Sequence, residues 1–387
     1  MVRSVTHDML PQATANEVSR QQFIVALKQG LNRGLRSSQA ALFDNVVAPA
    51  YEAEHGHPPR HREEIRAAMQ AEPAYQTWSA LARAAQEQMW VAVGDSVFRD
   101  RFRLARRAAE LDSSPQRLGS LTLNPDFEPP RGVTAVDIHL QTGGYALDLG
   151  GYDCSAGALY EVGGNLYAFG QGISRTDSKS AHVQRFIAER FPQLQPKRIL
   201  DMGCSAGSAS VPYALAFPDA EVHAIDVGAG MLRYAHARAE SLGKRVHFSQ
   251  QDATATNFPD GHFDLITSSI LFHETSAKAL PAILRETWRL LAPGGIAVHG
   301  DLPPFWAMDE FNQFMLDCET WYNNEPYWGA MREVDQVALS IKAGFAPENV
   351  EFCMAPSAYR AAAGHDRSFE AGEFAPGNAW QVLVTRK

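Results

Sequence analysis

The chain has 387 residues, is 45% hydrophobic and carries a formal net charge of −9. This length is typical of about two domains, and the acidic balance argues against long nucleic acid as a partner. No apolar run reaches the roughly 18–20 residues of a membrane span, and residues 1–19 lack the apolar core of a signal peptide, so we expect a cytoplasmic protein with no membrane partner.

The four cysteines lie far apart along the chain, at Cys154, Cys204, Cys318 and Cys353. None of them forms a Cys-x-x-Cys pair, so the sequence predicts neither a disulfide framework nor a zinc ribbon. No other metal-binding motif is readable, and no bound metal is expected.

The N-terminal third has a helical pattern. Residues 1–20 are polar and are expected to fray. From about residue 20 to residue 111, apolar side chains recur at spacings of three and four, which predicts helices. The segment 55–61 contains Pro58 and Pro59 and is expected to interrupt them. Residues 124–131 are rich in proline and are interpreted as a connector.

A short β element is expected next. Residues 158–162 and 166–169 are two apolar runs that flank Gly163-Gly164-Asn165, which predicts a β-hairpin. Residues 178–191 then have the pattern of an amphipathic helix that leads into the first core strand.

From Arg198 onward, short apolar runs alternate with helical patterns. Strands are expected at 198–201, 221–226, 246–250, 263–268 and 295–300, and helices at 208–217, 229–242 and 278–291. Such alternation predicts a parallel sheet that is covered on both faces. Right-handed crossovers would place all strand C-termini at one edge, where ligands bind.

Three carboxylates are expected at that edge. Asp201 ends the first strand and is followed by a glycine turn, while Asp226 and Asp252 follow the next two strands. A strand, a glycine turn, a helix and a second strand that ends in an acid form the layout of a nucleoside-binding βαβ unit. Each carboxylate has two acceptor oxygens, which suits Asp226 to two ribose hydroxyls.

This pattern resembles the class I S-adenosylmethionine-dependent methyltransferases. The resemblance covers residues 180–300 and continues through 343–352 and 380–384, which look like that fold's sixth and seventh strands. It implies a Rossmann-like sheet of seven strands with helices on both faces. It also implies S-adenosylmethionine as the cofactor and S-adenosylhomocysteine as the product.

The resemblance assigns a role to each cofactor residue. The methionine part would lie against the first motif, Asp201, Gly203, Ser205 and Gly207. Asp226 would bind the ribose, Val227 and Met231 would line the adenine, and Asp252 and Ala253 would meet its amine. Ser268 belongs to the motif of the fourth strand, and the turn Pro293-Gly294-Gly295 precedes the fifth.

The predicted organisation has two parts. Residues 1–175 would form a mainly helical region with a small β element, which dimerises or caps the acceptor pocket. Residues 176–387 would form the methyltransferase domain, with an aromatic-rich insertion at about 302–334. We expect methyl transfer to an oxygen or nitrogen of a small aromatic or apolar metabolite, in secondary metabolism, by a homodimer. Carbon acceptors stay open, whereas arsenite would need clustered thiols.

Three residues are candidates for catalysis. His273 follows the fourth strand and could take a proton from the acceptor, while Glu274 orients it. Either residue could instead be structural, because methyl transfer from a sulfonium can run on alignment alone. His139 is a second candidate base, although nothing in the sequence places it near the cleft. Candidate acceptor-binding side chains in the aromatic segment are Trp306, Phe311, Phe314, Tyr322 and Trp328.

Other interpretations of the glycine turn stay open. Gly203-Cys204-Ser205-Ala206-Gly207 also fits the nucleophile elbow of an α/β-hydrolase, with Ser205 as nucleophile. Its partners would be Asp252 or Asp264 and His273 or His299, but Asp201 and Asp226 would then have no role. The Gly-x-Gly-x-x-Gly fingerprint of a NAD site is missing. A cofactor-binding scaffold without turnover would have the same loop.

Overall fold

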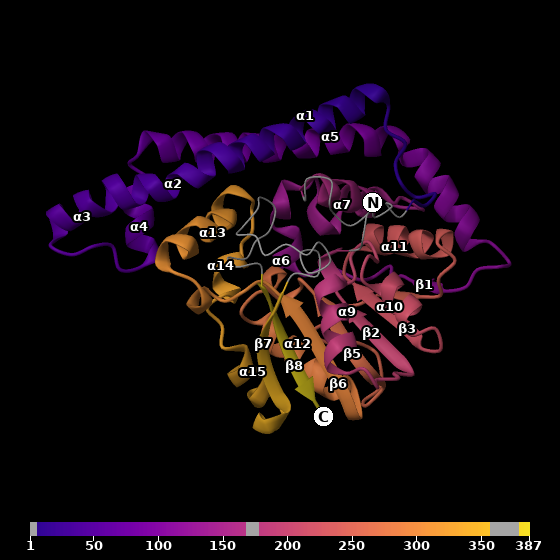
Figure 1. Cartoon of the computed structure of the whole chain (residues 1–387). Coiled ribbons are helices and arrows are strands. Elements are labelled where there is room, and N and C mark those ends of the chain that lie inside the picture. The colour runs from indigo at the N-terminus through magenta and orange to yellow at the C-terminus, as the bar shows by residue number, and fades with distance from the viewer. Residues whose placement is uncertain (1–5, 168–177, 357–378) are drawn as a thin grey trace.

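A mixed β-sheet with helices on both faces forms the C-terminal part of the chain, and long N-terminal helices lie across one side of it (Figure 1). The computed structural model describes residues 6–167, 178–356 and 379–387. The predicted α/β class with an additional helical region is therefore confirmed. The predicted boundary between residues 175 and 176 lies outside the described residues and stays a prediction.

The N-terminal helices are long, as the apolar spacing predicts. A continuous run of helix covers residues 15–55, and Pro58 and Pro59 lie in the loop that ends it. The helices of this region are α1 (Ala15–Gly30), η1 (Leu31–Arg36), α2 (Ser37–Leu42), η2 (Phe43–Val47), α3 (Ala48–His55), α4 (Arg62–Met69) and α5 (Pro73–Asp112). The 40-residue helix α5 packs against both α1 and α7 (Ser155–Tyr167).

The sheet contains eight strands in the order β1-β4-β3-β2-β5-β6-β8-β7. They are β1 (Ser120–Thr122), β2 (Arg198–Met202), β3 (Glu221–Asp226), β4 (His247–Gln250), β5 (Phe263–Ser269), β6 (Leu291–Asp301), β7 (Val350–Pro356) and β8 (Ala379–Arg386). The pairs β6–β8 and β7–β8 are antiparallel, and the other pairs are parallel. The seven predicted strands are present. The eighth, β1, has only three residues and was missed because so short a segment shows no periodicity.

Helices cover each face of the sheet through a separate apolar core. On one face lie α9 (Ser178–Arg190), α10 (Ser210–Ala216) and α11 (Ala229–Ser241), and on the other lie α12 (Ala279–Leu290) and α15 (Gln336–Ala343). Neighbouring strand residues alternate between the two cores: Ile199 joins the first and Leu200 the second. None of the helices in the described ranges combines the length and apolar character needed to cross a membrane.

Short elements complete the described chain. They are α6 (Arg131–Thr134), η3 (Ile138–Leu140), η4 (Gly144–Ala146), η5 (Phe272–Glu274), η6 (Phe305–Ala307), α13 (Glu310–Tyr322), α14 (Trp328–Met331) and η7 (Pro347–Asn349). The predicted aromatic insertion corresponds to η6, α13 and α14, which follow β6.

The predicted hairpin is wrong over residues 158–167, which belong to helix α7; Phe169 lies outside the described residues. The glycines of this segment allow close helix packing. A Cβ atom at Gly163 would lie 2.3 Å from the ring of Trp90 in α5, and one at Gly157 would lie 2.3 Å from the Cβ atom of Tyr234 in α11. Gly-Gly therefore marks a contact between helices here and not a turn.

The expectation that residues 1–20 fray is wrong for residues 6–20, of which residues 15–20 belong to helix α1. Met9 is fully buried in the core between α1, α5 and α7. The Nε2 atom of His7 lies 3.0 Å from Oε1 of the buried Glu161 in α7. Helix α1 then begins with a capping box formed by Thr14 and Glu17. Residues 6–14 are ordered because their few apolar and charged side chains contact buried residues that are distant in sequence.

The close packing of α7 on α11 can be tested by Gly157→Ala. The added methyl group would overpack the contact with Tyr234, so the free energy of unfolding should fall by about 1–3 kcal/mol. Urea unfolding followed by circular dichroism measures this change. In the control Gly30→Ala the methyl group meets nothing within 4 Å, and stability should be unchanged or rise by up to about 1 kcal/mol. Equal stability of both variants would contradict the packing described here.

Candidate active site

The loop after β2 has an unusual backbone. Gly203 (φ 71°), Ser205 (φ 42°) and Gly207 (φ 73°) all have positive φ, which is unfavourable for a residue with a Cβ atom such as Ser205. The Ser205 N–H donates a 2.8 Å hydrogen bond to Oδ2 of Asp226, and the Gly228 N–H donates one of 2.9 Å to Oδ1. The carboxylate at the end of β3 thus fixes the glycine loop and the start of α11 in one arrangement.

The same loop lies beside two other segments. A Cβ atom at Gly203 would lie 2.7 Å from Leu271, which follows β5, and one at Gly228 would lie 2.4 Å from the carbonyl oxygen of Tyr145. The loop after β5 and the N-terminal segment around Tyr145 therefore meet at the edge where β2 and β3 end. This is the edge at which ligands bind in open α/β sheets.

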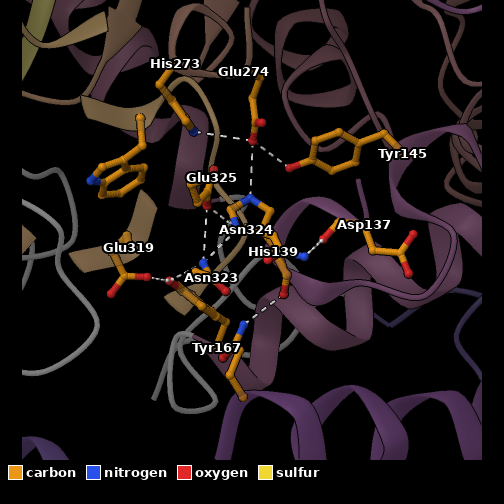
Figure 2. Close-up of polar contacts among 12 residues, drawn as sticks. Asp137, His139, Tyr145, Tyr167, His273, Glu274, Glu319, Asn323, Asn324 and Glu325 are labelled. Carbon is orange, nitrogen blue, oxygen red and sulfur yellow. Dashed lines mark hydrogen bonds and ion pairs between the residues drawn. The ribbon is translucent and has the colours of Figure 1, made fainter. Parts of the chain in front are cut away.

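A group of buried polar residues, here called the polar cluster, lies next to that edge. It consists of His139, Tyr145, His273, Glu274, Asp301, Asn323 and Glu325. Figure 2 shows most of these side chains converging on Glu274 and His139. They come from η3, η4, η5, the end of β6 and the loop between α13 and α14.

The centre of the polar cluster is Glu274. Its Oε1 atom accepts a 2.7 Å hydrogen bond from the Tyr145 hydroxyl and lies 3.4 Å from Nε2 of His273 and 3.2 Å from Nε2 of His139. The other ring nitrogen of His273 lies 2.8 Å from Oδ1 of Asp301. The structure thus brings the three predicted catalytic residues together, including His139, which the sequence could not place.

The other side of His139 is also held. Its Nδ1 atom lies 2.5 Å from Oε1 of Glu325, and its carbonyl oxygen accepts hydrogen bonds from Trp90 and Gln86 in α5. The residue has a φ of 58°, in the left-handed region. Contacts from three segments therefore hold His139 in a backbone conformation that costs free energy.

Charge and burial shift the pKa values of the cluster. Burial lowers the pKa of His139, but Glu325 and Glu274 outweigh it and raise that pKa to about 10. Burial likewise disfavours a charged His273, yet Asp301 and Glu274 raise its pKa well above the ordinary value. Burial raises the pKa of Glu325, whereas for Glu274 the two histidines outweigh burial and lower the pKa. Both imidazoles are therefore stabilised in their charged form.

Comparison with known proteins identifies the sheet. Residues 199–295 match a family model described as a methyltransferase domain. The demethylmenaquinone methyltransferase of Thermus thermophilus is 39% identical over 109 residues, which is 28% of this chain and 49% of that protein. The malonyl-[acyl-carrier protein] O-methyltransferase of Halorhodospira halophila is 32% identical over 130 residues, which is 32% of this chain and 43% of that protein.

Residues 199–295 therefore belong to a methyltransferase domain of the class I S-adenosylmethionine-dependent type. S-adenosylmethionine is therefore its cofactor. The chain spans less than half the length of these two curated relatives. Among solved structures, a phosphoethanolamine N-methyltransferase of Haemonchus contortus in complex with S-adenosylmethionine is 19% identical, with a TM-score of 0.41, over 54% of this chain and 52% of that one.

The loop and its carboxylate fit this cofactor. The two backbone N–H groups occupy one lone pair on each oxygen of Asp226, which leaves other lone pairs for ribose hydroxyls. Val227 is partly buried and Met231 is fully buried just beyond β3, at the start of α11. Asp252 and Ala253 are partly exposed after β4, as an adenine contact requires. These roles stay predictions.

Two other predicted cofactor residues already have partners in the protein. The buried Asp201 accepts a 2.6 Å hydrogen bond from the Ser210 hydroxyl, and burial raises its pKa to about 7. The Ser268 hydroxyl lies 2.8 Å from Nδ1 of His299 in β6. Both residues lie near strand ends beside the glycine loop, and these contacts hold their side chains in place.

The predicted acceptor-binding aromatics are not gathered at one place. Phe311, Phe314 and Tyr322 contribute to an apolar core between α4, α5 and α13, and Trp306 is 72% exposed. Trp328 alone among the five is recorded in contact with the polar cluster, with its ring centroid 5.4 Å from that of His273. Helix α13 therefore packs against the N-terminal helices, whereas Trp328 belongs to an apolar core on the sheet.

Four members of the polar cluster were not predicted. Asp301 ends β6, so the rule that identified Asp201 and Asp226 at strand ends could have found it. Tyr145 follows Gly143 and Gly144, and no local pattern indicates that it belongs to a site. Nothing in the local sequence distinguishes Asn323 and Glu325 from polar residues that are exposed to solvent, because only the tertiary fold buries them. They were found only from the structure.

The hydrolase interpretation of Ser205 is not supported. His273 pairs with Asp301 and Glu274, and His299 pairs with Ser268. Within the described ranges, no histidine forms a recorded hydrogen bond with Ser205. The family match over residues 199–295 explains the glycine turn instead.

The anchoring role of Asp301 can be tested by Asp301→Ala. This carboxylate accepts hydrogen bonds from the backbone N–H groups of Phe272 and Leu302 and holds His273. Removing it leaves buried donors without a partner, so the free energy of unfolding should fall by about 3–5 kcal/mol. Asp309→Ala, which removes the exposed N-cap of α13, is a matched control and should cost about 1 kcal/mol. Equal losses in chemical denaturation would refute a special role for Asp301.

Proposed function

We propose that this chain transfers a methyl group from S-adenosylmethionine to an oxygen or nitrogen of a small-molecule acceptor. The observation that carries the proposal is the glycine loop, whose left-handed backbone is tied to Asp226 inside the family-matched residues. The curated relatives include methyltransferases that are named for a quinone precursor and for a malonyl carrier protein. They support the reaction type and leave the acceptor open.

In this proposal, residues of the glycine loop and Asp226 bind and orient the cofactor. Asp226 binds the ribose and the glycine loop surrounds the methionine part, which fixes the direction of the sulfonium. Bound S-adenosylmethionine supplies an electrophilic methyl group, and its transfer breaks the carbon–sulfur bond, leaves the electron pair on sulfur and releases a proton from the acceptor. Such a displacement is accelerated mainly by alignment of the two reactants.

The polar cluster is proposed as the wall that orients the acceptor. Both ring nitrogens of His273 face carboxylates, which favours its protonated form. A protonated His273 could act as a base only after giving a proton to Glu274 or Asp301. Positioning of the acceptor is therefore the role that this geometry supports best. Residues of the N-terminal region, His139 and Tyr145, would then cap the acceptor pocket.

Several finer features stay proposals. The acceptor is proposed to be aromatic or apolar in part, because Trp328 lies against His273. Action in secondary metabolism, a cytoplasmic location and a homodimer formed by residues 1–175 rest on the sequence predictions. Transfer to carbon stays open.

The cofactor site can be tested by Asp226→Ala. Loss of charged hydrogen bonds to the ribose should weaken binding of S-adenosylmethionine by about 1–3 kcal/mol, or roughly 5- to 150-fold, in isothermal titration calorimetry. Asp219→Ala removes an exposed carboxylate from the turn that precedes β3, at the opposite end of the strand from Asp226, and should leave the affinity unchanged. If wild-type protein binds neither the cofactor nor S-adenosylhomocysteine, the proposed function is wrong.

The reaction can be tested with methyl-labelled S-adenosylmethionine and a panel of phenols, amines and carboxylic acids. Wild-type protein should label at least one class, and His273→Ala should lower kcat on it by about 100-fold, the scale expected from misalignment. Cofactor affinity should stay within about twofold, because the polar partners of His273 are Asp301 and Glu274 and not residues of the glycine loop. A variant that keeps full turnover would exclude His273 from the reaction.

A further inference from the structure

Three side chains of the polar cluster bring potential metal ligands together. One ligand atom from each of His139, Glu274 and Glu325 lies within 4.8 Å of the other two. The side chains are 19%, 13% and 0% exposed, so they are screened from water. One imidazole and two carboxylates form a mixed nitrogen–oxygen set that suits divalent ions such as Mn²⁺ and Zn²⁺. No sequence motif indicates this set, because its members are 135 and 51 residues apart along the chain.

Buried oxygens that lack partners lie in the same residues. Among the described residues, Oε2 of Glu274, Oε2 of Glu325 and Oδ1 of the adjacent Asn323 are buried and have no hydrogen-bond partner. A buried acceptor without a partner costs about 1–3 kcal/mol, and more when it is charged. A structure tolerates such a cost where a ligand supplies the missing positive charge.

Surrounding contacts fix the direction of each ligand. The Tyr145 hydroxyl donates to Glu274, and Nε2 of His273 lies beside the same oxygen. The Asn323 amide lies 3.2 Å from Oε1 of Glu325 and 3.1 Å from Nδ1 of His139. Residues that hold ligands through hydrogen bonds in this way are typical of metal sites.

The backbone is strained at the same places. Five non-glycine residues in the described ranges have positive φ: His139, Leu140, Ser205, Ile270 and Asn324. Ser205 belongs to the cofactor loop. Of the other four, His139 is itself one of the three potential ligands. Each of the remaining three lies within four residues of a potential ligand. Strain of this kind persists where the surrounding structure enforces it, and it gathers at functional sites.

We propose that His139, Glu274 and Glu325 bind a divalent metal ion beside the cofactor cleft. The His139 ring lies between the two carboxylates, with Nδ1 2.5 Å from Oε1 of Glu325 and Nε2 3.2 Å from Oε1 of Glu274. Three protein ligands leave coordination positions open, as in catalytic metal sites. If the proposed function also holds, those positions would take oxygen atoms of the acceptor, which favours an acceptor with a hydroxyl or carboxylate group.

The site can be tested with Mn²⁺ and the full chain after treatment with a chelator. Calorimetry and the loss of the free Mn²⁺ signal in electron paramagnetic resonance should both report one ion per chain. Glu274→Gln and Glu325→Gln keep the shape of each side chain but remove a charged ligand, so each should weaken Mn²⁺ binding by at least about tenfold. Glu348→Gln removes an exposed carboxylate on η7 and should bind as the wild type does.

The outcomes separate this proposal from the proposed function. No Mn²⁺ uptake at millimolar concentration, or equal uptake by all three variants and the wild type, would overturn the metal site. A melting curve for each variant shows whether it is folded, and His139→Gln gives an independent variant should one of the others fail to fold. Binding of S-adenosylmethionine without Mn²⁺ uptake would refute only the metal site, and Mn²⁺ uptake without cofactor binding would refute only the proposed function.

Discussion

Parallel pairing of β2 with β3 and β5 is the constraint on which the site depends. It places the carboxyl ends of three strands at one edge, so that the glycine loop, Asp226 and the loop with His273 meet there without long connections. The hydrogen bonds from Ser205 and Gly228 to Asp226 then fix the cofactor side of the cleft. The sheet thereby determines where the cofactor side of the site lies, before any N-terminal residue contributes.

The polar cluster depends on contacts between segments that are distant in sequence. His139 and Tyr145 belong to the stretch between α6 and α7, and Glu325 belongs to the loop after α13. Helix α5 holds the carbonyl oxygen of His139, and β6 supplies Asp301 to His273. Buried charge is expensive, so these groups persist only because each carboxylate faces a histidine or a hydrogen-bond donor. The N-terminal region therefore contributes side chains and hydrogen bonds to the polar cluster itself.

The features that could be predicted from the sequence are those that depend on apolar periodicity or on a position at the end of a strand. The core strands, the helices between them and the positions of Asp201 and Asp226 follow from apolar spacing over short ranges. The hairpin at 158–167 was predicted wrongly because Gly163 serves close packing against Trp90 and not a turn. The proximity of His139 to Glu274 could not be predicted, because no local pattern reports which distant segments meet. The same holds for the segment 6–14, whose polar composition concealed its buried contacts.

The core shared by α5, α7 and α11 has an evolutionary consequence. Tyr234 and Ala237 of α11 are buried against the N-terminal helices, and Glu161 of α7 accepts a hydrogen bond from the Tyr234 hydroxyl beside the guanidinium of Arg238. A methyltransferase core inherited without those helices would expose apolar surface and leave Arg238 without this carboxylate. Exchange of either region for a different one would therefore require compensating changes along α11.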